Sequence, residues 1–156
     1  MNSLHQLSGR CHCGNISYTF DSPLEKTELP IRRCDCSFCT RQGATYTSHP
    51  KGRLKVLIDD KQSVQWYRYG SETAEALLCT LCGVFPLISS TIDERMYAVL
   101  NANSINGLHI DQQQVTLVPY VEHSTDEMLR KRQENWIPEV EIEEGTRPRG
   151  IDPSFF

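Results

Sequence analysis

All seven cysteines of this 156-residue chain fall in three short clusters. In sequence they read Cys11-His12-Cys13, Cys34-Asp35-Cys36-Ser37-Phe38-Cys39 and Cys79-Thr80-Leu81-Cys82. Thiolates this close in sequence commonly share one metal ion, and zinc takes four ligands. Seven thiolates therefore fit one complete zinc site and one zinc site that keeps a position free for water or substrate. The complete site would join segments that lie far apart in the sequence, which constrains the fold more than any other feature.

Two other uses of the cysteines explain less. Disulfides cannot pair an odd number of cysteines, and a Cys-x-Cys spacing is too short for a relaxed disulfide. A redox pair at Cys79 and Cys82 would leave the five other cysteines without a role. Clustered thiols suit a reducing cytosol, where we expect this cytoplasmic protein to work. The first eight residues lack the features of a secretory signal, and no apolar run reaches the ~20 residues that span a membrane.

Spacing also indicates which cysteines share an ion. Cys34, Cys36 and Cys39 lie closest together and form one set, which we call the three-cysteine cluster. The four-cysteine cluster then contains the remaining residues, Cys11, Cys13, Cys79 and Cys82. A different partition, which joins Cys34 and Cys36 to one of the other pairs, would leave two thiolates without a complete site.

Histidine is the other common protein ligand of zinc. His12 lies between two cysteines that point inward, so alternation predicts that its side chain points outward, and Asp35 is the same case. If a protein ligand completes the three-cysteine cluster, His49 and His123 are the first candidates.

Charge is distributed unevenly around the three-cysteine cluster. The net charge of the chain is −4, so it lacks the basic excess typical of a nucleic-acid-binding surface, and we expect no nucleic-acid partner. Between residues 31 and 55, only one acid, Asp35, accompanies six basic residues: Arg32, Arg33, Arg41, Lys51, Arg53 and Lys55. This stretch is either a solvated basic surface or an electropositive approach for a small anionic substrate.

The hydrophobic pattern is typical of a mainly β protein built from small sheets. Short alternating or apolar runs predict strands at 16–20, 53–58, 63–69, 84–88, 96–100 and 115–118. The polar segments between them predict two hairpins, one from the second and third strands and one from the fourth and fifth. Hydrophobic residues make up only 38% of the chain, so metal sites would supplement a modest core.

Helix is predicted in two places. A single turn at 37–42 would carry Cys39 back toward Cys36. A longer helix at 125–133 follows Ser124, with an acidic first turn and a basic last turn that suit the helix dipole. Its apolar face is thin, which predicts a short C-terminal helix on the surface.

The last segment of the chain differs in composition from the rest. From residue 137 onward Pro, Glu and Gly dominate, which predicts an irregular tail whose Phe155 and Phe156 could dock on a partner. We therefore expect one domain at 1–136 and a C-terminal tail at 137–156.

The order of these motifs resembles that of a known family. Three segments carry the resemblance: Gly9-Arg10-Cys11-His12-Cys13-Gly14, then Cys34-x-Cys36-x-x-Cys39-Thr40-Arg41-Gln42-Gly43, then Cys79-x-x-Cys82-Gly83. They closely resemble the glutathione-dependent formaldehyde-activating enzymes, a family that includes the centromere protein V domain, over roughly residues 8–120. Family members often have His where Asp35 stands here, and Thr or Ser where Val84 stands.

The resemblance implies a zinc-stapled, β-tent-like fold with two zinc ions per chain. One ion would be structural, on the four-cysteine cluster, and the other would be open and catalytic, on the three-cysteine cluster. It also implies a carbon–sulfur lyase that handles the adduct of a small-molecule thiol, glutathione, with formaldehyde, as S-(hydroxymethyl)glutathione synthase does. Arg33 and Arg41 flank the cluster and are candidates to pair with the carboxylates of glutathione. The alternatives are a zinc-stabilised binding module without catalysis and a redox or metal-buffering protein.

Overall fold

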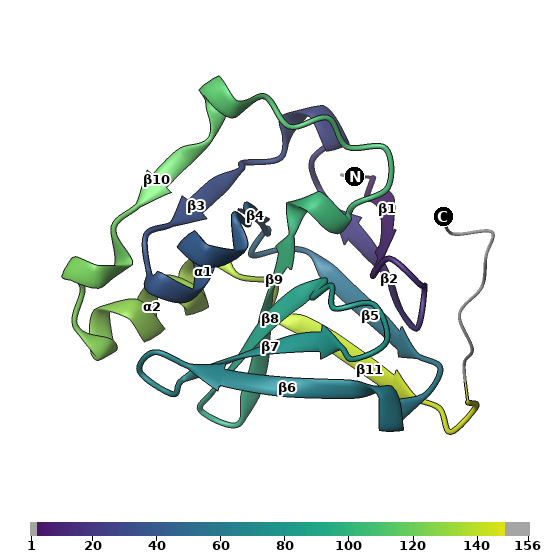
Figure 1. The fold of residues 1–156 in the computed structure, drawn as a ribbon. Coiled ribbons are helices and arrows are strands. Elements are labelled where there is room, and N and C mark those ends of the chain that lie inside the picture. The colour runs from purple at the N-terminus through teal and green to yellow at the C-terminus, as the bar shows by residue number, and fades with distance from the viewer. Residues whose placement is uncertain (1–2, 149–156) are drawn as a thin grey trace.

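The structure is a computed structural model that describes residues 3–148 of the chain. Two β-sheets form its framework, which confirms the prediction of a mainly β fold (Figure 1). The smaller sheet has the order β1-β2-β5-β11, with β1 at His5–Arg10, β2 at Ile16–Ser22, β5 at Arg53–Ile58 and β11 at Glu139–Glu144. β2 is antiparallel to both of its neighbours, whereas β11 is parallel to β5.

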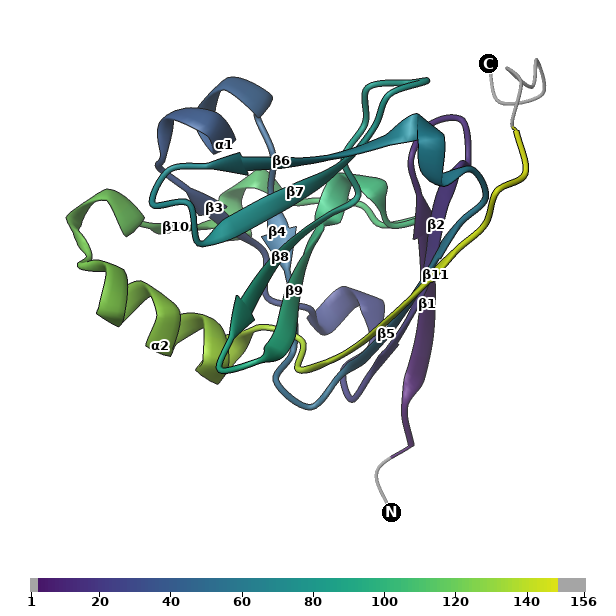
Figure 2. The same cartoon turned by 90° about the horizontal axis from the view of Figure 1, so that it is seen from below.

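The larger sheet has seven strands in the order β10-β3-β4-β9-β8-β7-β6. These strands are β3 (Arg32–Cys34), β4 (Tyr46–Thr47), β6 (Val64–Tyr69), β7 (Ala74–Cys79), β8 (Leu87–Ile92), β9 (Arg95–Asn101) and β10 (Thr116–Val118). All pairs are antiparallel except β10 with β3. In Figure 2 the smaller sheet stands on one side of the molecule, and β6 to β9 lie beside it.

The main core lies between the two sheets. Alternation along β2 turns Ile16, Tyr18 and Phe20 inward, as the sequence pattern predicts, and all three are buried. They pack in one cluster with residues of the larger sheet such as Leu77 and Leu100, which are also buried.

The helices lie at the end of the larger sheet that is remote from the smaller sheet (Figures 1 and 2). The predicted helical turn is α1 (Ser37–Gln42) and the predicted longer helix is α2 (Thr125–Asn135). The Ser124 hydroxyl accepts a hydrogen bond from the Glu127 N–H at 3.2 Å and so caps α2. Five 3-10 turns complete the described elements: Lys26–Glu28, Lys61–Ser63, Ala102–Ser104, Gln112–Gln114 and Tyr120–Glu122. No helix in residues 3–148 is long and apolar enough to cross a membrane.

One predicted hairpin is confirmed and the other is wrong. β8 and β9 pair antiparallel through a tight turn at Asp93 and Glu94, whose φ values of 50° and 66° suit a hairpin turn. β5 and β6 do not pair, because they belong to different sheets. Between them the Asp60 carboxylate accepts hydrogen bonds from the Gln62 N–H and the Ser63 hydroxyl, and the resulting 3-10 turn redirects the chain.

The prediction of an irregular tail from residue 137 is wrong for the residues up to 144. Ile137 is fully buried and exchanges two backbone hydrogen bonds with Ala98, and β11 then pairs with β5 along its whole length. Val140 and Ile142 pack against the core, so the alternation with glutamate is that of a half-buried edge strand. The expectation for Phe155 and Phe156 lies outside the described residues.

The buried start of this last strand should be needed for stability. We expect Ile137→Ala to lower the free energy of unfolding by about 2–5 kcal/mol, because it removes a fully buried side chain between the sheets. Glu141→Ala, on the exposed face of β11, is the matched control and should change it by less than about 0.5 kcal/mol. Chemical denaturation measures the free energy of unfolding of both variants. If Ile137→Ala lowers it no more than the control does, this segment contributes little to the stability of the fold.

Candidate metal centres and the adjoining pocket

The four-cysteine cluster connects the two sheets. Cys11 and Cys13 lie in the loop between β1 and β2, Cys79 ends β7, and Cys82 lies in the loop that follows. The four Sγ atoms all lie within 4.8 Å of one another, with the Cys13 and Cys79 sulfurs 3.5 Å apart. The structure therefore gathers the same four cysteines that the spacing groups together, and their arrangement could hold a metal ion.

Two glycines shape the loops of this cluster. Gly14 and Gly83 directly follow the second cysteine of each pair and have φ values of 82° and 81°, in the region that favours glycine. The turns close through short backbone hydrogen bonds, such as that from the Gly83 N–H to the Cys79 carbonyl at 2.8 Å. Burial raises the pKa of Cys11, and it raises that of Cys79 to about 11. Buried thiols of this kind ionise when a cation such as zinc binds them.

The three-cysteine cluster is built on a strand end and a helix start. Cys34 ends β3, Cys36 is the N-cap of α1, and Cys39 lies within α1. Backbone N–H groups of Cys36 and Cys39 donate to the sulfurs of Cys34 and Cys36, each at 3.4 Å. The Tyr46 hydroxyl donates to the Cys39 sulfur at 3.1 Å. All three sulfurs lie within 4.8 Å of one another, so this set could also hold a metal ion.

Hydrogen bonding within this cluster favours the thiolate form of Cys36. Hydrogen bonds from the Cys34 and Cys39 thiols, aided by backbone N–H groups, lower the pKa of Cys36 to about 2. The hydrogen bond with Cys36 raises the pKa of Cys34 to about 11. A sulfur at a helix N-terminus is the usual place for a stabilised thiolate, and a bound metal ion would remove the remaining protons.

The three-cysteine cluster borders a cavity of about 760 Å³, which we call the main pocket. Cys34 and Cys36 line it together with four aromatic side chains, Phe38, Tyr67, Tyr69 and Tyr120. The Phe38 and Tyr69 rings stack with their centroids 4.3 Å apart. Apart from its cysteines and tyrosines, the titratable residues that line the pocket are Arg41 and His123. The pocket therefore combines thiols, an aromatic wall and little positive charge.

The two candidate arginines lie in different places. Arg41 is exposed, lines the main pocket and donates to the Ser37 carbonyl at 3.2 Å. Arg33 is also exposed, but it lines a separate cavity of about 430 Å³ on the side of Cys34 and Cys39. Only Arg41 is thus placed to meet a substrate in the main pocket.

The idea that the whole basic stretch surrounds this cluster is wrong. Arg53 and Lys55 lie on β5, in the smaller sheet, and form exposed ion pairs with Glu139 and Glu143. Arg32 is half-buried and donates to the Ser48 hydroxyl. A stretch that is continuous in sequence is divided here between two sheets.

The neighbouring acid and histidines lie outside both cysteine clusters. The Asp35 carboxylate accepts a hydrogen bond from the Val121 N–H at 3.1 Å, so it fixes the loop before α2. His12 is exposed, and the His49 Nδ1 accepts from the Lys51 N–H at 3.1 Å. His123 lines the main pocket, with Nε2 3.2 Å from the Lys131 amine and Nδ1 buried without a hydrogen-bond partner among the described residues.

Sequence reasoning missed the aromatic wall and a buried arginine of α2. Tyr67 and Tyr69 share one face of β6, which the alternation of the strand does indicate, but nothing local shows that this face borders the cysteines. Arg132 belongs to the basic end of α2, yet it is only 7% exposed. Its hydroxyl partners, Thr73 and Ser90, lie more than forty residues away, so no local pattern could reveal them.

A family model identifies the family of this chain. A family model described as glutathione-dependent formaldehyde-activating enzyme matches residues 6–122, which include every cysteine. The chain belongs to this family. A crystal structure of a Rhodobacter sphaeroides protein is similar at 24% identity and a TM-score of 0.49, covering 71% of this chain and 99% of that one. α2 and β11 lie beyond the segment that the family model matches.

The two clusters should differ in what they contribute to stability. We expect Cys79→Ser to lower the free energy of unfolding by more than about 4 kcal/mol, because it opens a site that joins the sheets. Cys36→Ser should cost less than about 2 kcal/mol, since serine keeps the N-cap of α1 and only the three-cysteine cluster is impaired. Thermal melts of the two variants decide this, and equal losses would make both clusters structural.

Proposed function

We propose that this protein is a zinc-dependent carbon–sulfur lyase that acts on the adduct of a thiol and an aldehyde. One observation carries the proposal: three cysteine sulfurs converge within 4.8 Å of one another, and two of these cysteines, Cys34 and Cys36, line a cavity of about 760 Å³. A three-thiolate zinc site keeps a fourth position for an external ligand. Family membership supports glutathione as the thiol and formaldehyde as the aldehyde.

Zinc fits both cysteine clusters. Thiolate sulfur is a soft ligand, and sites with only sulfur ligands select zinc, copper(I) or iron–sulfur clusters over harder ions. The four-cysteine cluster is mostly buried and complete, as structural zinc sites are, whereas the three-cysteine cluster is incomplete and faces the main pocket. We therefore assign a structural zinc to the first and an open zinc to the second.

Cleavage of the adduct R–S–CH₂–OH breaks the carbon–sulfur bond and gives formaldehyde and the thiol R–SH. Zinc, when bound by Cys34, Cys36 and Cys39, supplies a positive centre that stabilises thiolate sulfur. As the carbonyl forms, one proton must leave the hydroxyl oxygen of the adduct. One proton must also be delivered to the sulfur to give R–SH. His123 lines the same pocket and is the imidazole available to accept and return that proton.

The remaining pocket residues bind and shield the substrate. The aromatic wall excludes water from one side of the thiols, and the stacked Phe38 and Tyr69 rings give it a fixed shape. Arg41 is the arginine of the pocket lining and would pair with a carboxylate of glutathione.

The seven cysteines are unpaired, and such thiols persist in a reducing compartment, so we place the activity in the cytoplasm.

Binding of glutathione should depend on its free thiol. In calorimetric titration of the zinc-loaded protein, glutathione should bind at millimolar or lower concentration, because its thiolate completes the open site. S-methylglutathione keeps every charge but cannot supply a thiolate, so it should bind at least about tenfold more weakly, a difference of about 1.4 kcal/mol. Equal binding of the two compounds, or no binding of glutathione, would favour a binding module or another substrate.

The two exposed arginines provide a matched pair of variants for the same titration. Arg41→Gln should weaken glutathione binding by about three- to fivefold and reduce its salt dependence, as expected for an exposed ion pair. Arg33→Gln removes the same charge from outside the main pocket and should leave the affinity unchanged. A larger effect of Arg33→Gln would place the carboxylates of the ligand on the other side of Cys34.

A further inference from the structure

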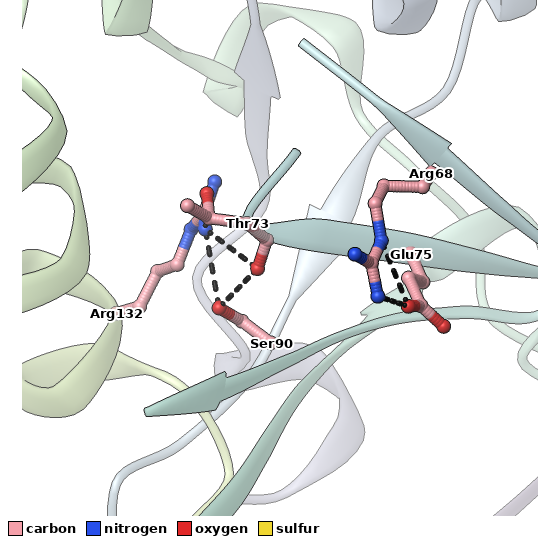
Figure 3. A network of polar contacts seen from close by, with 5 residues as sticks. All are labelled: Arg68, Thr73, Glu75, Ser90 and Arg132. Atoms are coloured by element: carbon pink, nitrogen blue, oxygen red, sulfur yellow. Dashed lines mark hydrogen bonds and ion pairs between the residues drawn. The ribbon is translucent and has the colours of Figure 1, made fainter. Parts of the chain in front are cut away.

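Arg132 is a buried cation without a carboxylate partner among the described residues. It extends from α2 toward the larger sheet and is only 7% exposed (Figure 3). Its guanidinium donates to the Thr73 hydroxyl at 2.8 Å and to the Ser90 hydroxyl at 3.2 Å, and it stacks over the Trp136 ring at 5.1 Å. Its Nε is buried and has no hydrogen-bond partner in residues 3–148.

A buried positive charge is costly unless negative charge compensates for it. The ion pairs of the described residues involve other cations: Arg53, Lys55, Arg68 and Arg130. Hydroxyl groups and an aromatic ring give Arg132 only partial negative charge. A neutral side chain could make the same hydrogen bonds without the cost of burying a charge, so the charge itself calls for an explanation.

Two residues that contact Arg132 also line cavities beside the three-cysteine cluster. Trp136, on which Arg132 stacks, lines a small cavity of about 40 Å³ together with Cys34 and Cys39. The Met128 sulfur accepts from the Arg132 guanidinium at 3.0 Å, and Met128 lines the main pocket. Arg132 thus contacts one residue from the lining of each of these two cavities.

Electrostatics agrees with this placement. Burial lowers the pKa of Arg132, and the ionised forms of Tyr69, Tyr120, Cys34 and Cys36 act in the opposite direction. An arginine remains protonated after such a shift, so the guanidinium keeps its charge. Residues of the thiol site and its aromatic wall are therefore among the ionisable groups that interact with this charge.

We propose that Arg132 is the counter-cation of the three-cysteine cluster and that it favours a thiolate as the fourth ligand. The inference rests on the proposed function, because it takes a divalent ion to be held by the three thiolates. Such a centre carries a net charge of −1; a neutral ligand leaves that charge unchanged, whereas a thiolate makes it −2. A fixed positive charge nearby stabilises the doubly negative state more than the singly negative one.

In this role Arg132 is a positioning residue, since it contacts neither the substrate nor the sulfur ligands. It comes from α2, which lies outside the segment matched by the family model. The role explains why an arginine, rather than a neutral polar residue, fills the space between α2, Thr73 and Ser90.

Cobalt(II) gives a readout that does not depend on catalysis, because its absorption bands report the ligands of the open site. The full-length protein is loaded with cobalt(II) and titrated with 2-mercaptoethanol, which binds as a thiolate, and with imidazole, which binds as a neutral ligand. Arg132→Gln removes the charge but keeps a polar side-chain donor, and it should weaken thiolate binding by about tenfold at an effective dielectric constant of about 20. Imidazole binding should change by less than about twofold, since it adds no charge.

Two further variants separate charge from structure. Arg132→Lys keeps the charge and should keep the preference for thiolate over imidazole, even if it lowers the melting temperature. Arg68→Met removes a cation that is exposed and paired with Glu75 (Figure 3), and it should change neither affinity. If Arg132→Gln does not fold, Arg132→Met replaces it as the neutral variant.

The outcomes distinguish the two proposals. If the wild-type protein shows no spectral change with either ligand, the open metal site itself is wrong and the inference falls with it. If the wild type binds thiolate but the neutral variant keeps the same preference over imidazole, Arg132 only anchors α2 and the inference is overturned. A selective loss of thiolate binding in the neutral variant, with retention in Arg132→Lys, supports it.

Discussion

The convergence of four thiols between the two sheets is the interaction on which the rest of the structure depends. The sheets otherwise share a modest core in a chain that is 38% hydrophobic. Cys13 and Cys79 are 66 residues apart in sequence and have their sulfurs 3.5 Å apart. A metal ion that closes such a long loop removes much of the freedom of the unfolded chain. An ion in the four-cysteine cluster would fix the β1–β2 loop against β7 and so set the position of one sheet relative to the other.

The three-cysteine cluster differs because its cysteines come from β3 and α1, at the end of the larger sheet, and so it does not join one sheet to the other. Cys36 caps α1 and Tyr46 donates to Cys39, so the thiols are held by local contacts from a helix and a short strand. Their open side faces the main pocket rather than another segment of the chain. The two clusters therefore differ in place: one joins the two sheets, and the other exposes Cys34 and Cys36 to the main pocket.

Local patterns predicted the elements that depend on neighbouring residues. The grouping of the cysteines, the helical turn that carries Cys39, and the capping of α2 by Ser124 all follow from spacing, and the structure contains each of them. The β8–β9 hairpin also follows, although its turn is tighter than the polar segment suggests because Asp93 and Glu94 adopt positive φ.

What the sequence did not reveal depends on contacts between distant segments. The Pro- and Glu-rich composition after residue 136 outweighed the alternation of Val140 and Ile142, and only the pairing with β5 shows that this segment is a strand. The sequence of the basic end of α2 is typical of a solvated surface, and only the folded structure shows that Arg132 donates a hydrogen bond to Thr73. Likewise, the predicted basic approach to the cysteines divides between two sheets, which leaves Arg41 at the main pocket.

X-ray absorption at the zinc edge counts the ligands of the bound ions and so tests whether the chain holds one closed and one open zinc site. We expect two zinc ions per chain, with seven sulfur ligands in total at about 2.3 Å and one oxygen or nitrogen ligand at about 2.0–2.2 Å. Addition of glutathione should replace that lighter ligand with an eighth sulfur. A single zinc per chain, or a sulfur count that does not rise with glutathione, would contradict the account.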